Sequence, residues 1–340
     1  MRVLVLGGSR FVGAWLVDEL VNAGHQVTVF NRGQTPAILP ADVERLYGDR
    51  QDHSQVREVL EGQEYDVIYD VSGYTLPETS VMVDIFKGRI SHYIYISSAA
   101  VYERRWYAPV TEDFSYSNVE GGDYGRNKAS TELFLLRAHQ EIDFPASIVR
   151  PWMVFGPGNP SFAREQLFFR RAELGRTIIL PFNGFLHMQY GHVQDLARAL
   201  VLMAGKSQCF GEAYNITGPE AITMNGYLQL ISELTGRALN VLYLTFSEAK
   251  EATASKRDLL PFPWQYSRIA SIQKAMDHFG FWPKYSSRLC TEDTYQWYKN
   301  EGASDLEHDF TFEDSLISRH ASDSSRLGVI APDGDMPQVV

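Results

Sequence analysis

The sequence predicts an α/β fold, in which a doubly wound parallel sheet is followed by a smaller, partly discontinuous C-terminal domain. Short apolar runs rich in β-branched residues recur through the first 155 residues, with helical segments between them. Strands that alternate with helices in this way indicate a parallel sheet covered by helices on both faces. A glycine-rich turn follows the first run, and the alternation ends soon after Arg150, where longer loops and aromatic residues begin.

Five apolar runs mark the predicted strands in chain order. The first, "RVLVLGG", leads into the glycine-rich turn and a helix, and the second, "QVTVFNRG", reaches Asn31 before its polar turn. The others are "YDVIYDVSG", "HYIYISSAAVY" and "ASIVRPWMVFG". Sheets of this kind bind ligands beyond the carboxyl ends of their strands, so the residues that follow each run are candidate site residues.

We expect two domains and a tail. Residues 1–155 read as a dinucleotide-binding (Rossmann) domain, completed by return segments near 187–216. Residues 156–315 read as a substrate domain, because their short mixed elements and loops differ from the regular alternation before them. Residues 316–340 follow a polar, acidic stretch and are expected to form a loosely ordered tail.

Composition narrows the class of protein. The hydrophobic content of 44% and charged content of 21% are ordinary for a globular protein, and the net charge of −11 argues against a nucleic-acid surface while leaving a local basic patch open. Cys209 and Cys290 lie far apart, and the nine histidines show no ligand spacing, so we expect neither disulfides nor a metal. The first strand begins at Arg2 and no apolar run could span a bilayer, so the expected location is cytoplasmic, with no membrane partner.

The turn "GGSRFVG" is a candidate pyrophosphate-binding loop. Gly7 and Gly8 permit a tight turn and close backbone approach, and Gly13 permits close helix packing, while the helix amino end supplies N–H donors. Arg10 stands where such turns usually carry a middle glycine. The residues expected to contact the cofactor are Gly7, Gly8, Ser9, Arg10, Phe11, Val12, Gly13, Asn31, Arg32, Asp49, Arg50, Val71, Ser72, Gly73, Lys128, Pro151 and Val154.

The end of the second strand bears on the choice of cofactor. Folds that prefer NAD usually place a carboxylate there for the ribose hydroxyls, whereas a 2′-phosphate prefers a cation. Asn31 and Arg32 stand there, and Arg10 could reach the same region, so the expected cofactor is NAD(P) with NADP slightly favoured. The alternative is that Arg32 is a solvated turn residue and Arg10 packs over the adenine or points outward. Asp49 could accept a hydrogen bond from the adenine amino group or cap a helix.

Ser98, Tyr124 and Lys128 form the strongest candidate for catalysis. On a helix, residues four apart share a face, so the Lys128 ammonium could lower the pKa of the Tyr124 phenol. The phenolate could then take a proton from a substrate hydroxyl, and Ser98 at a strand end would hydrogen-bond the same oxygen. The same spacing recurs at Tyr295 and Lys299, but no serine-ended strand precedes that pair, so we treat it as a chance match.

These motifs resemble the extended short-chain dehydrogenase/reductase superfamily, which includes nucleotide-sugar epimerases and dehydratases. The resemblance covers nearly the whole chain through "GGSRFVG", "SSAAVY", "YGRNK", "RPWMVFGPGNP" and "YGHVQDLARA". A closer likeness, through "FNRG", "PFPWQYSRIASIQKAMDHFGFWP" and "DFTFEDSLI", is to the chloroplast stem-loop RNA-binding proteins and their bacterial relatives, which share the arginine in the turn. The chloroplast members have lost the catalytic tyrosine. This chain keeps Tyr124, which favours a working oxidoreductase.

The resemblance leaves the substrate open. Epimerases often place an arginine just before the His-Val-x-Asp segment to bind a diphosphate, whereas this chain has Met188 there. Dehydratases carry Asp and Glu after the active-site serine or threonine, where this chain has alanines, so dehydration is not expected. Arg104 and Arg105 could meet a phosphate, although exposed arginine pairs are usually solvated. Candidate substrate residues are Ala99, Ala100, Tyr74, His187, Gln189 and Trp264.

Three functions compete. The leading one is an NAD(P)-dependent sugar or nucleotide-sugar epimerase, which removes a hydride and returns it to the other face. The second is an NADPH-dependent ketoreductase of a sugar-like substrate, favoured by Arg32. The third is an RNA-binding protein that uses the fold as a scaffold, against which the acidic charge and the intact Ser98, Tyr124 and Lys128 count. The catalytic helix often forms a dimer interface in the superfamily, so a homodimer is one expected assembly.

Overall fold

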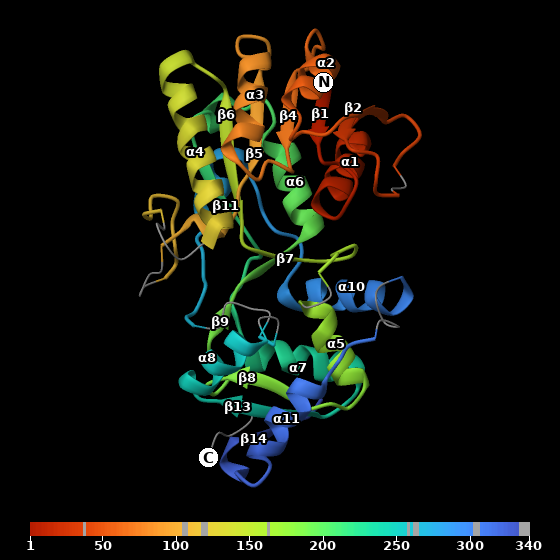
Figure 1. Ribbon diagram of the computed structural model, residues 1–340, viewed down its shortest axis with the longest axis vertical. Helices are drawn as coiled ribbons and strands as arrows, with labels where there is room; N and C mark the ends of the chain where they lie inside the picture. The colour runs from red at the N-terminus through yellow and green to blue at the C-terminus, as the bar shows by residue number, and fades with distance from the viewer. Residues whose placement is uncertain are drawn as a thin grey trace. The chain divides into compact units, whose positions relative to one another are not determined.

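The computed structural model describes residues 1–36, 39–103, 108–116, 122–161, 164–256, 259–260, 265–301 and 307–332. The chain divides into two compact units, each described separately below (Figure 1). The first unit contains Met1–Val154, Gly191–Gly218 and Ala270–Lys284, and the second contains Phe155–Tyr190, Pro219–Ile269 and Tyr285–Val340. Among the described helices, none combines the length and apolar content that crossing a bilayer requires.

The first unit is built on a seven-stranded sheet with the order β11-β6-β5-β4-β1-β2-β3. All six strand pairings are parallel, which confirms the predicted doubly wound sheet. The strands are β1 (Arg2–Leu6), β2 (Gln26–Asn31), β3 (Glu44–Tyr47), β4 (Val67–Asp70), β5 (His92–Ile96), β6 (Ala146–Pro151) and β11 (Ala213–Ile216). The strand order reverses between β1 and β4, and such a switch point is where open α/β sheets bind ligands.

Helices cover both faces of this sheet, and alternating side chains supply the two cores. In β1, Val3 and Val5 join the core beneath one helical layer, whereas Leu4 and Leu6 join the core beneath the other. The first layer consists of α1 (Val12–Asn22), α6 (Val193–Met203) and α9 (Gln273–Phe279). The second consists of α2 (His53–Leu60), α3 (Leu76–Phe86) and α4 (Gly122–Ile142). The helix α9 also belongs to this unit, whereas we expected no return segment beyond residue 216.

The second unit contains a three-stranded sheet of order β14-β13-β8. The strand β13 (Leu239–Leu244) runs parallel to β8 (Ile178–Pro181) and antiparallel to β14 (Leu327–Ile330). The small strands β9 (His187–Met188) and β12 (Ile222–Thr223) pair with each other. The helices are α5 (Glu165–Glu173), α7 (Met224–Thr235), α8 (Phe246–Ser255), α10 (Ser287–Asn300) and α11 (Thr311–His320). Two short strands, β7 (Met153–Phe155) and β10 (Tyr190–His192), pair where the chain passes between the units.

The expectation of a loosely ordered tail over 316–340 is wrong for its described part, residues 316–332. Leu316 is buried in α11, and β14 adds an antiparallel strand to β13. Side chains of α7 fix the end of this strand, because the Ser232 hydroxyl donates to the Ile330 carbonyl at 3.1 Å and Gln229 donates to the Ala331 carbonyl at 3.0 Å. The strand β14 was not predicted because it is short and lies in a polar stretch, and a strand at the edge of a sheet needs only one apolar face.

Candidate active site

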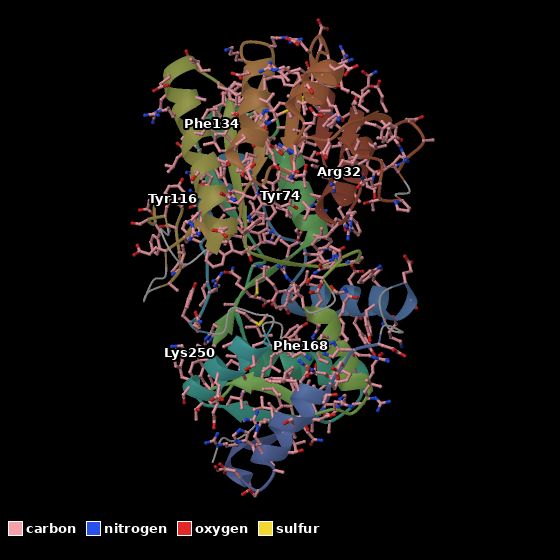
Figure 2. All side chains as sticks on the ribbon, in the orientation of Figure 1. Arg32, Tyr74, Tyr116, Phe134, Phe168 and Lys250 are labelled. Carbon is pink, nitrogen blue, oxygen red and sulfur yellow. The ribbon has the colours of Figure 1, made fainter. Side chains whose placement is uncertain are left out.

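The carboxyl ends of β1, β2, β4 and β5 carry most of the predicted site residues. Because these strands are parallel neighbours in the sheet, the segments that follow them meet along one edge. Two residues labelled in Figure 2 mark this edge: Arg32 follows β2, and Tyr74 lies in the segment after β4. The edge therefore brings together the glycine turn and the segment that contains Ser98.

The glycine turn accommodates Arg10 without a positive φ at Arg10 itself. Arg10 does not adopt the left-handed conformation that would require glycine, whereas the next residue, Phe11, has φ 42°. The Arg10 carbonyl accepts hydrogen bonds from the N–H groups of Gly13 at 3.0 Å and Ala14 at 3.4 Å, and so starts helix α1. The exposed Arg10 side chain can therefore replace the usual middle glycine while the turn is kept.

The start of α1 fits a dinucleotide pyrophosphate. No side chain caps this helix, and the positive end of its dipole favours an anion there. Gly13 lies so close to the turn that an added Cβ would stand 2.1 Å from the Gly7 carbonyl oxygen. A glycine at this point allows the uncapped helix end to lie directly against the turn. Binding of the cofactor pyrophosphate at this turn stays a prediction.

The region expected to hold the adenosine contains two exposed cations. Among the described residues, neither Arg10 nor Arg32 has an ion-pair partner. Asn31 fixes the turn, since its side-chain Nδ2 donates to the Ser9 hydroxyl at 2.6 Å and its side-chain Oδ1 accepts from the Gly33 N–H at 2.8 Å. The exposed guanidinium groups of Arg10 and Arg32 could therefore bind a phosphate.

Asp49 is not a helix cap. The cap of α2 is Asp52, whose carboxylate accepts hydrogen bonds from the N–H groups of Ser54 at 3.0 Å and Gln55 at 3.3 Å. The Asp49 carboxylate accepts from the Gln51 N–H at 3.0 Å, and its residue is only half-buried. An adenine contact for Asp49 stays a prediction.

Arg50 forms an internal ion pair, and its predicted contact with the cofactor stays a prediction. Its guanidinium donates two hydrogen bonds to the buried carboxylate of Asp70, at 2.6 and 3.1 Å. The same guanidinium donates to the Ser72 hydroxyl and to the Glu78 carbonyl, both at 3.0 Å. These partners lie within the protein, so the charge of Arg50 is neutralised there.

Lys128 lies on the inner face of α4 and is only 2% exposed. Its Nζ donates to the carbonyl oxygens of Gly73 and Ile96, both at 2.7 Å. These carbonyls belong to the segments that follow β4 and end β5, so the lysine fixes α4 to the edge of the sheet. Burial lowers the pKa of Lys128 to about 8, although the negative charge of Asp70 partly opposes that shift.

Tyrosine rings surround the Lys128 ammonium. Nζ lies 4.7 Å from the ring centroid of Tyr95, 5.3 Å from that of Tyr74 and 5.9 Å from that of Tyr124. Tyr95 is buried, whereas Tyr74 and Tyr124 are 55% and 45% exposed. Tyr124 is therefore an exposed tyrosine whose ring lies beside a buried amine.

The Ser98 segment packs against the start of α4. The Ser98 hydroxyl accepts the Ala100 N–H at 3.2 Å and so caps a short 3-10 turn, Ala99–Val101. Gly125, next to Tyr124, approaches the Ala100 carbonyl so closely that an added Cβ would stand 2.5 Å from its oxygen. The structure thus brings the predicted catalytic residues onto adjoining segments.

The remaining predicted residues fall in three places. The residues on or beside the sheet edge of the first unit are Val71, Ser72, Gly73, Ala99, Ala100, Pro151 and Val154. His187 and Gln189 belong to the second unit, within and just after β9. Trp264, Arg104 and Arg105 lie outside the described residues. Tyr295 of the chance match is buried in α10, and its hydroxyl donates to Glu173 at 3.1 Å. Among the described residues, no cluster of His, Cys, Asp or Glu could hold a metal.

Comparison with known proteins gives the family. The model of the NAD dependent epimerase/dehydratase family matches residues 3–85 and 78–217. The chain belongs to this family. It is therefore a member of an enzyme family of the extended short-chain dehydrogenase/reductase type, as the motifs predicted, and the family is NAD-dependent.

The relatives and solved structures that resemble this chain carry names for different functions. The chloroplast stem-loop binding protein of 41 kDa b from Arabidopsis thaliana is 30% identical over 94% of this chain and 84% of its own length, which confirms the closer likeness. A UDP-glucose 4-epimerase from Corynebacterium glutamicum is 24% identical over 87% of this chain and 95% of its own. A solved UDP-glucuronic acid 4-epimerase from Bacillus cereus, in complex with NAD, has a TM-score of 0.71 at 20% identity, covering 89% of this chain and 100% of that one. That likeness concerns the fold alone.

Sequence reasoning missed the buried partners behind the family's site. Asp70 ends the apolar run "YDVIYD", and a carboxylate on such a strand must be neutralised if it is fully buried. An aspartate at the end of an apolar strand could have indicated that a buried cation neutralises it, but the sequence does not indicate which lysine or arginine that is. The pairing of Asp70 with Arg50 depends on tertiary structure.

Proposed function

We propose that this chain is an NAD(P)-dependent oxidoreductase of the epimerase type, which removes a hydride from a sugar or nucleotide sugar and returns it. The observation that carries the proposal is the arrangement of Tyr124 and Lys128, an exposed phenol beside a buried amine that is fixed to the sheet edge by two carbonyls. Folding alone does not explain the buried amine of Lys128, because burying an amine is unfavourable.

Each residue has a separate part in the proposed chemistry. Tyr124 accepts the proton of the substrate hydroxyl as a phenolate and returns it at the end of the cycle. The ammonium of Lys128 favours that phenolate by its charge. Ser98 donates a hydrogen bond to the same substrate oxygen. A bound nicotinamide dinucleotide supplies the hydride acceptor, and Gly7, Gly13 and the start of α1 would hold its pyrophosphate.

NADP is the slightly favoured cofactor in this proposal. Arg10 and Arg32 are exposed beside the carboxyl end of β2, where no carboxylate stands to bind the ribose hydroxyls. A 2′-phosphate would neutralise one or both of them.

A reductase is the second candidate, and the same two arginines favour it. An enzyme that consumes NADPH must exchange its cofactor in each cycle, whereas an epimerase regenerates its own. The epimerase therefore turns over without added reductant. The stem-loop binding named for the Arabidopsis relative suggests a third function, against which the net charge of −11 counts.

Mass spectrometry of small molecules released from the freshly purified protein tests the proposal. We expect a nicotinamide dinucleotide, with a sugar or nucleotide sugar as the second compound. The compound found then serves as substrate in a turnover assay without added reductant. A requirement for stoichiometric NADPH would favour the reductase over the epimerase. Co-purified RNA without a dinucleotide would favour the RNA-binding function.

Substitution of Tyr124 tests the mechanism on that substrate. Tyr124→Phe removes the phenolic oxygen but keeps the ring, so kcat should fall by about 10²–10⁴-fold with little change in cofactor affinity. Tyr295→Phe, at the chance match in the second unit, is the matched control and should leave kcat within about twofold of wild type. Full turnover in Tyr124→Phe would show that another group moves the proton.

A further inference from the structure

We propose that the buried pair of Arg50 and Asp70 is a positioning device that holds both Lys128 and the glycine turn at the sheet edge. The effect of this pair on catalysis rests on the proposed function. Its effect on structure, which is to hold the segment after β4 beside the glycine turn, does not. Arg50 connects Ser72, beside the glycine turn, to Asp70, which lies behind the Gly73 carbonyl that binds Lys128.

The carboxylate of Asp70 is fully enclosed and fully satisfied. Asp70 ends β4 and is 0% exposed. Besides the two hydrogen bonds from Arg50, it accepts one from the Tyr93 hydroxyl at 2.7 Å and one from the Thr79 hydroxyl at 3.1 Å. Arg50 holds the pKa of Asp70 below its ordinary value against the opposing effect of burial. The carboxylate therefore stays charged, and its geometry is determined from several sides.

The pair supports the segment that binds Lys128. Gly73 lies directly on the carboxylate, since an added Cβ would stand 2.6 Å from Asp70 Oδ2. The other side of the segment is fixed by Glu78, whose carboxylate accepts the Tyr74 N–H at 2.8 Å and whose carbonyl accepts from Arg50 at 3.0 Å. The Gly73 carbonyl can therefore meet Lys128 Nζ in only one position.

The pair also reaches the glycine turn. Arg50 Nη1 donates to the Ser72 hydroxyl at 3.0 Å, and that hydroxyl donates to the Leu6 carbonyl at 3.2 Å. Leu6 directly precedes the turn, and an added Cβ on Gly7 would stand 2.7 Å from the Ser72 Cβ. A shift of Arg50 would therefore be felt at the loop that is proposed to bind the pyrophosphate.

A stability role alone explains the pair poorly. Buried ion pairs lose hydration on both partners, and apolar side chains of similar volume are often equally stabilising. Such a pair is useful where direction matters, because charged hydrogen bonds fix the positions of their partners. Here the guanidinium of Arg50 fixes Asp70 at the end of β4, Ser72 in the segment after it and the carbonyl of Glu78 in α3.

The pair also affects the charge of Lys128. The groups that face this amine are the charges of Asp70, Arg50, Glu78 and Glu132 and the rings of Tyr74, Tyr95 and Tyr124. Asp70 favours the ammonium and Arg50 disfavours it. Loss of the Asp70 charge alone would thus remove a favourable interaction and leave an unfavourable one uncompensated.

The decisive variant is Asp70→Asn, which keeps the shape of the side chain and removes its charge. Two measurements need no substrate: an NMR titration of Tyr124 in protein carrying ¹³C at tyrosine Cζ, assigned with Tyr124→Phe, and calorimetric binding of NADP or NAD. In Asp70→Asn we expect the Tyr124 titration to shift by about half a unit or more, because the charges around Lys128 and the phenol change. Cofactor affinity should fall by about three- to tenfold, because the Ser72 link loosens.

Glu313→Gln is the matched control. Glu313 forms a buried ion pair with Arg171 at 3.0 Å in the second unit, so its loss disturbs the fold by a similar means. It should leave the Tyr124 titration and cofactor affinity unchanged. A folded Asp70→Asn that matches Glu313→Gln in both measurements would overturn the proposal.

A milder variant keeps the test decisive if Asp70→Asn does not fold. Ser72→Ala removes only the link from Arg50 to the Leu6 carbonyl, so it should weaken cofactor binding by about threefold without moving the Tyr124 titration. Unchanged cofactor affinity in Ser72→Ala would contradict the link to the glycine turn. The Tyr124 titration and the cofactor affinity do not depend on turnover. The kinetics of Tyr124→Phe can therefore refute the proposed function while the positioning role of the pair stands, and these two measurements can refute the positioning role while the proposed function stands.

Discussion

Lys128 experiences opposing effects on its charge. Burial disfavours the ammonium, whereas two carbonyl oxygens and the nearby Asp70 favour it. With a pKa of about 8, the amine carries its charge at neutral pH but loses it within the range of ordinary buffers. A lysine in this state can respond to small changes around it, which an exposed lysine cannot.

This pKa predicts how stability depends on pH. Between about pH 8 and the ordinary value of 10.5, the unfolded chain keeps the proton that the folded chain has released. The unfolded state then binds more protons, so the contribution of Lys128 to the free energy of unfolding rises with pH, by on the order of 3 kcal/mol at most. Below pH 8 both states are protonated and the cost of burying the charge is at its largest.

Urea unfolding of wild type and Lys128→Met at pH 7 and pH 10 measures this contribution. The free energy of unfolding of wild type minus that of Lys128→Met should increase between the two pH values. Taking the difference removes the effect of the buried tyrosines, which are common to both proteins. Lys299→Met, which removes an exposed lysine, should show no such change. An equal difference for Lys128→Met at both pH values would mean that Lys128 does not lose its proton early.

Arg32 governs the second prediction at this scale. A charge-assisted hydrogen bond from Arg32 to a 2′-phosphate should contribute about 1–3 kcal/mol, so Arg32→Ala should weaken NADP by roughly ten- to a hundredfold. NAD affinity should hardly change, because NAD lacks that phosphate. Calorimetric titration with both cofactors gives the four values, and Arg137→Ala, an exposed arginine of α4, is the control. Binding of NAD to wild type as tight as that of NADP would refute the preference.

At the scale of elements, α1 and α4 begin in the same way. Each helix carries a glycine in its first turns that lies against a carbonyl of the loop beside it, Gly13 against Gly7 and Gly125 against Ala100. An alanine at either position would overlap that oxygen and force the helix away. The two helices serve different parts of the proposed site, so the two substitutions should have different effects.

Gly13→Ala should weaken cofactor binding by at least about tenfold, because overpacking at the turn costs about 1–3 kcal/mol. Gly125→Ala should instead lower kcat by about a hundredfold with cofactor affinity nearly kept, because it displaces Tyr124 from Ser98. Calorimetry and steady-state kinetics on both variants separate these effects, and each variant controls for the other. Equal losses in both measurements would mean that the two helices do not act separately.

Five strands of the first unit, β1, β2, β4, β5 and β6, could be predicted because each follows from a local apolar pattern, whereas the outer strands β3 and β11 and the helix α9 carry no such pattern and were missed. The alternation of Val3 and Val5 with Leu4 and Leu6 has the period of a strand, and the glycine turn has its own spacing. The partners of Arg50 could not be predicted, because Arg50 and Asp70 lie on different elements and meet only in the folded unit. The same holds for β14, whose four residues give too short a pattern.

At the scale of the whole molecule, α4 carries exposed apolar side chains that a dimer would cover. Leu133 and Ile142 are 53% and 52% exposed, and Phe134, labelled in Figure 2, lies on the same helix. We expect a homodimer formed through this helix. Light scattering should give twice the chain mass for wild type and the single mass for Leu133→Glu, which would bring a charge into the interface.

Leu289→Glu is the matched control, because Leu289 is a similarly exposed leucine of α10 in the second unit. It should keep the dimer. If wild type has the mass of a single chain at every concentration, the predicted dimer interface on α4 is wrong.

The first unit is assembled from three separate stretches of chain, the last of which is Ala270–Lys284. A ribosome delivers β1 to β6 early, but the outer strand β11 and the covering helix α9 emerge only after parts of the second unit have been made. The nascent chain must therefore keep the apolar sides of β6 and its neighbours from aggregating until residue 284 has left the exit tunnel. Slow translation between residues 154 and 284 would prolong that exposure. Yield of active protein in the cell should accordingly depend on chaperones that bind the nascent chain, even where the finished protein is stable.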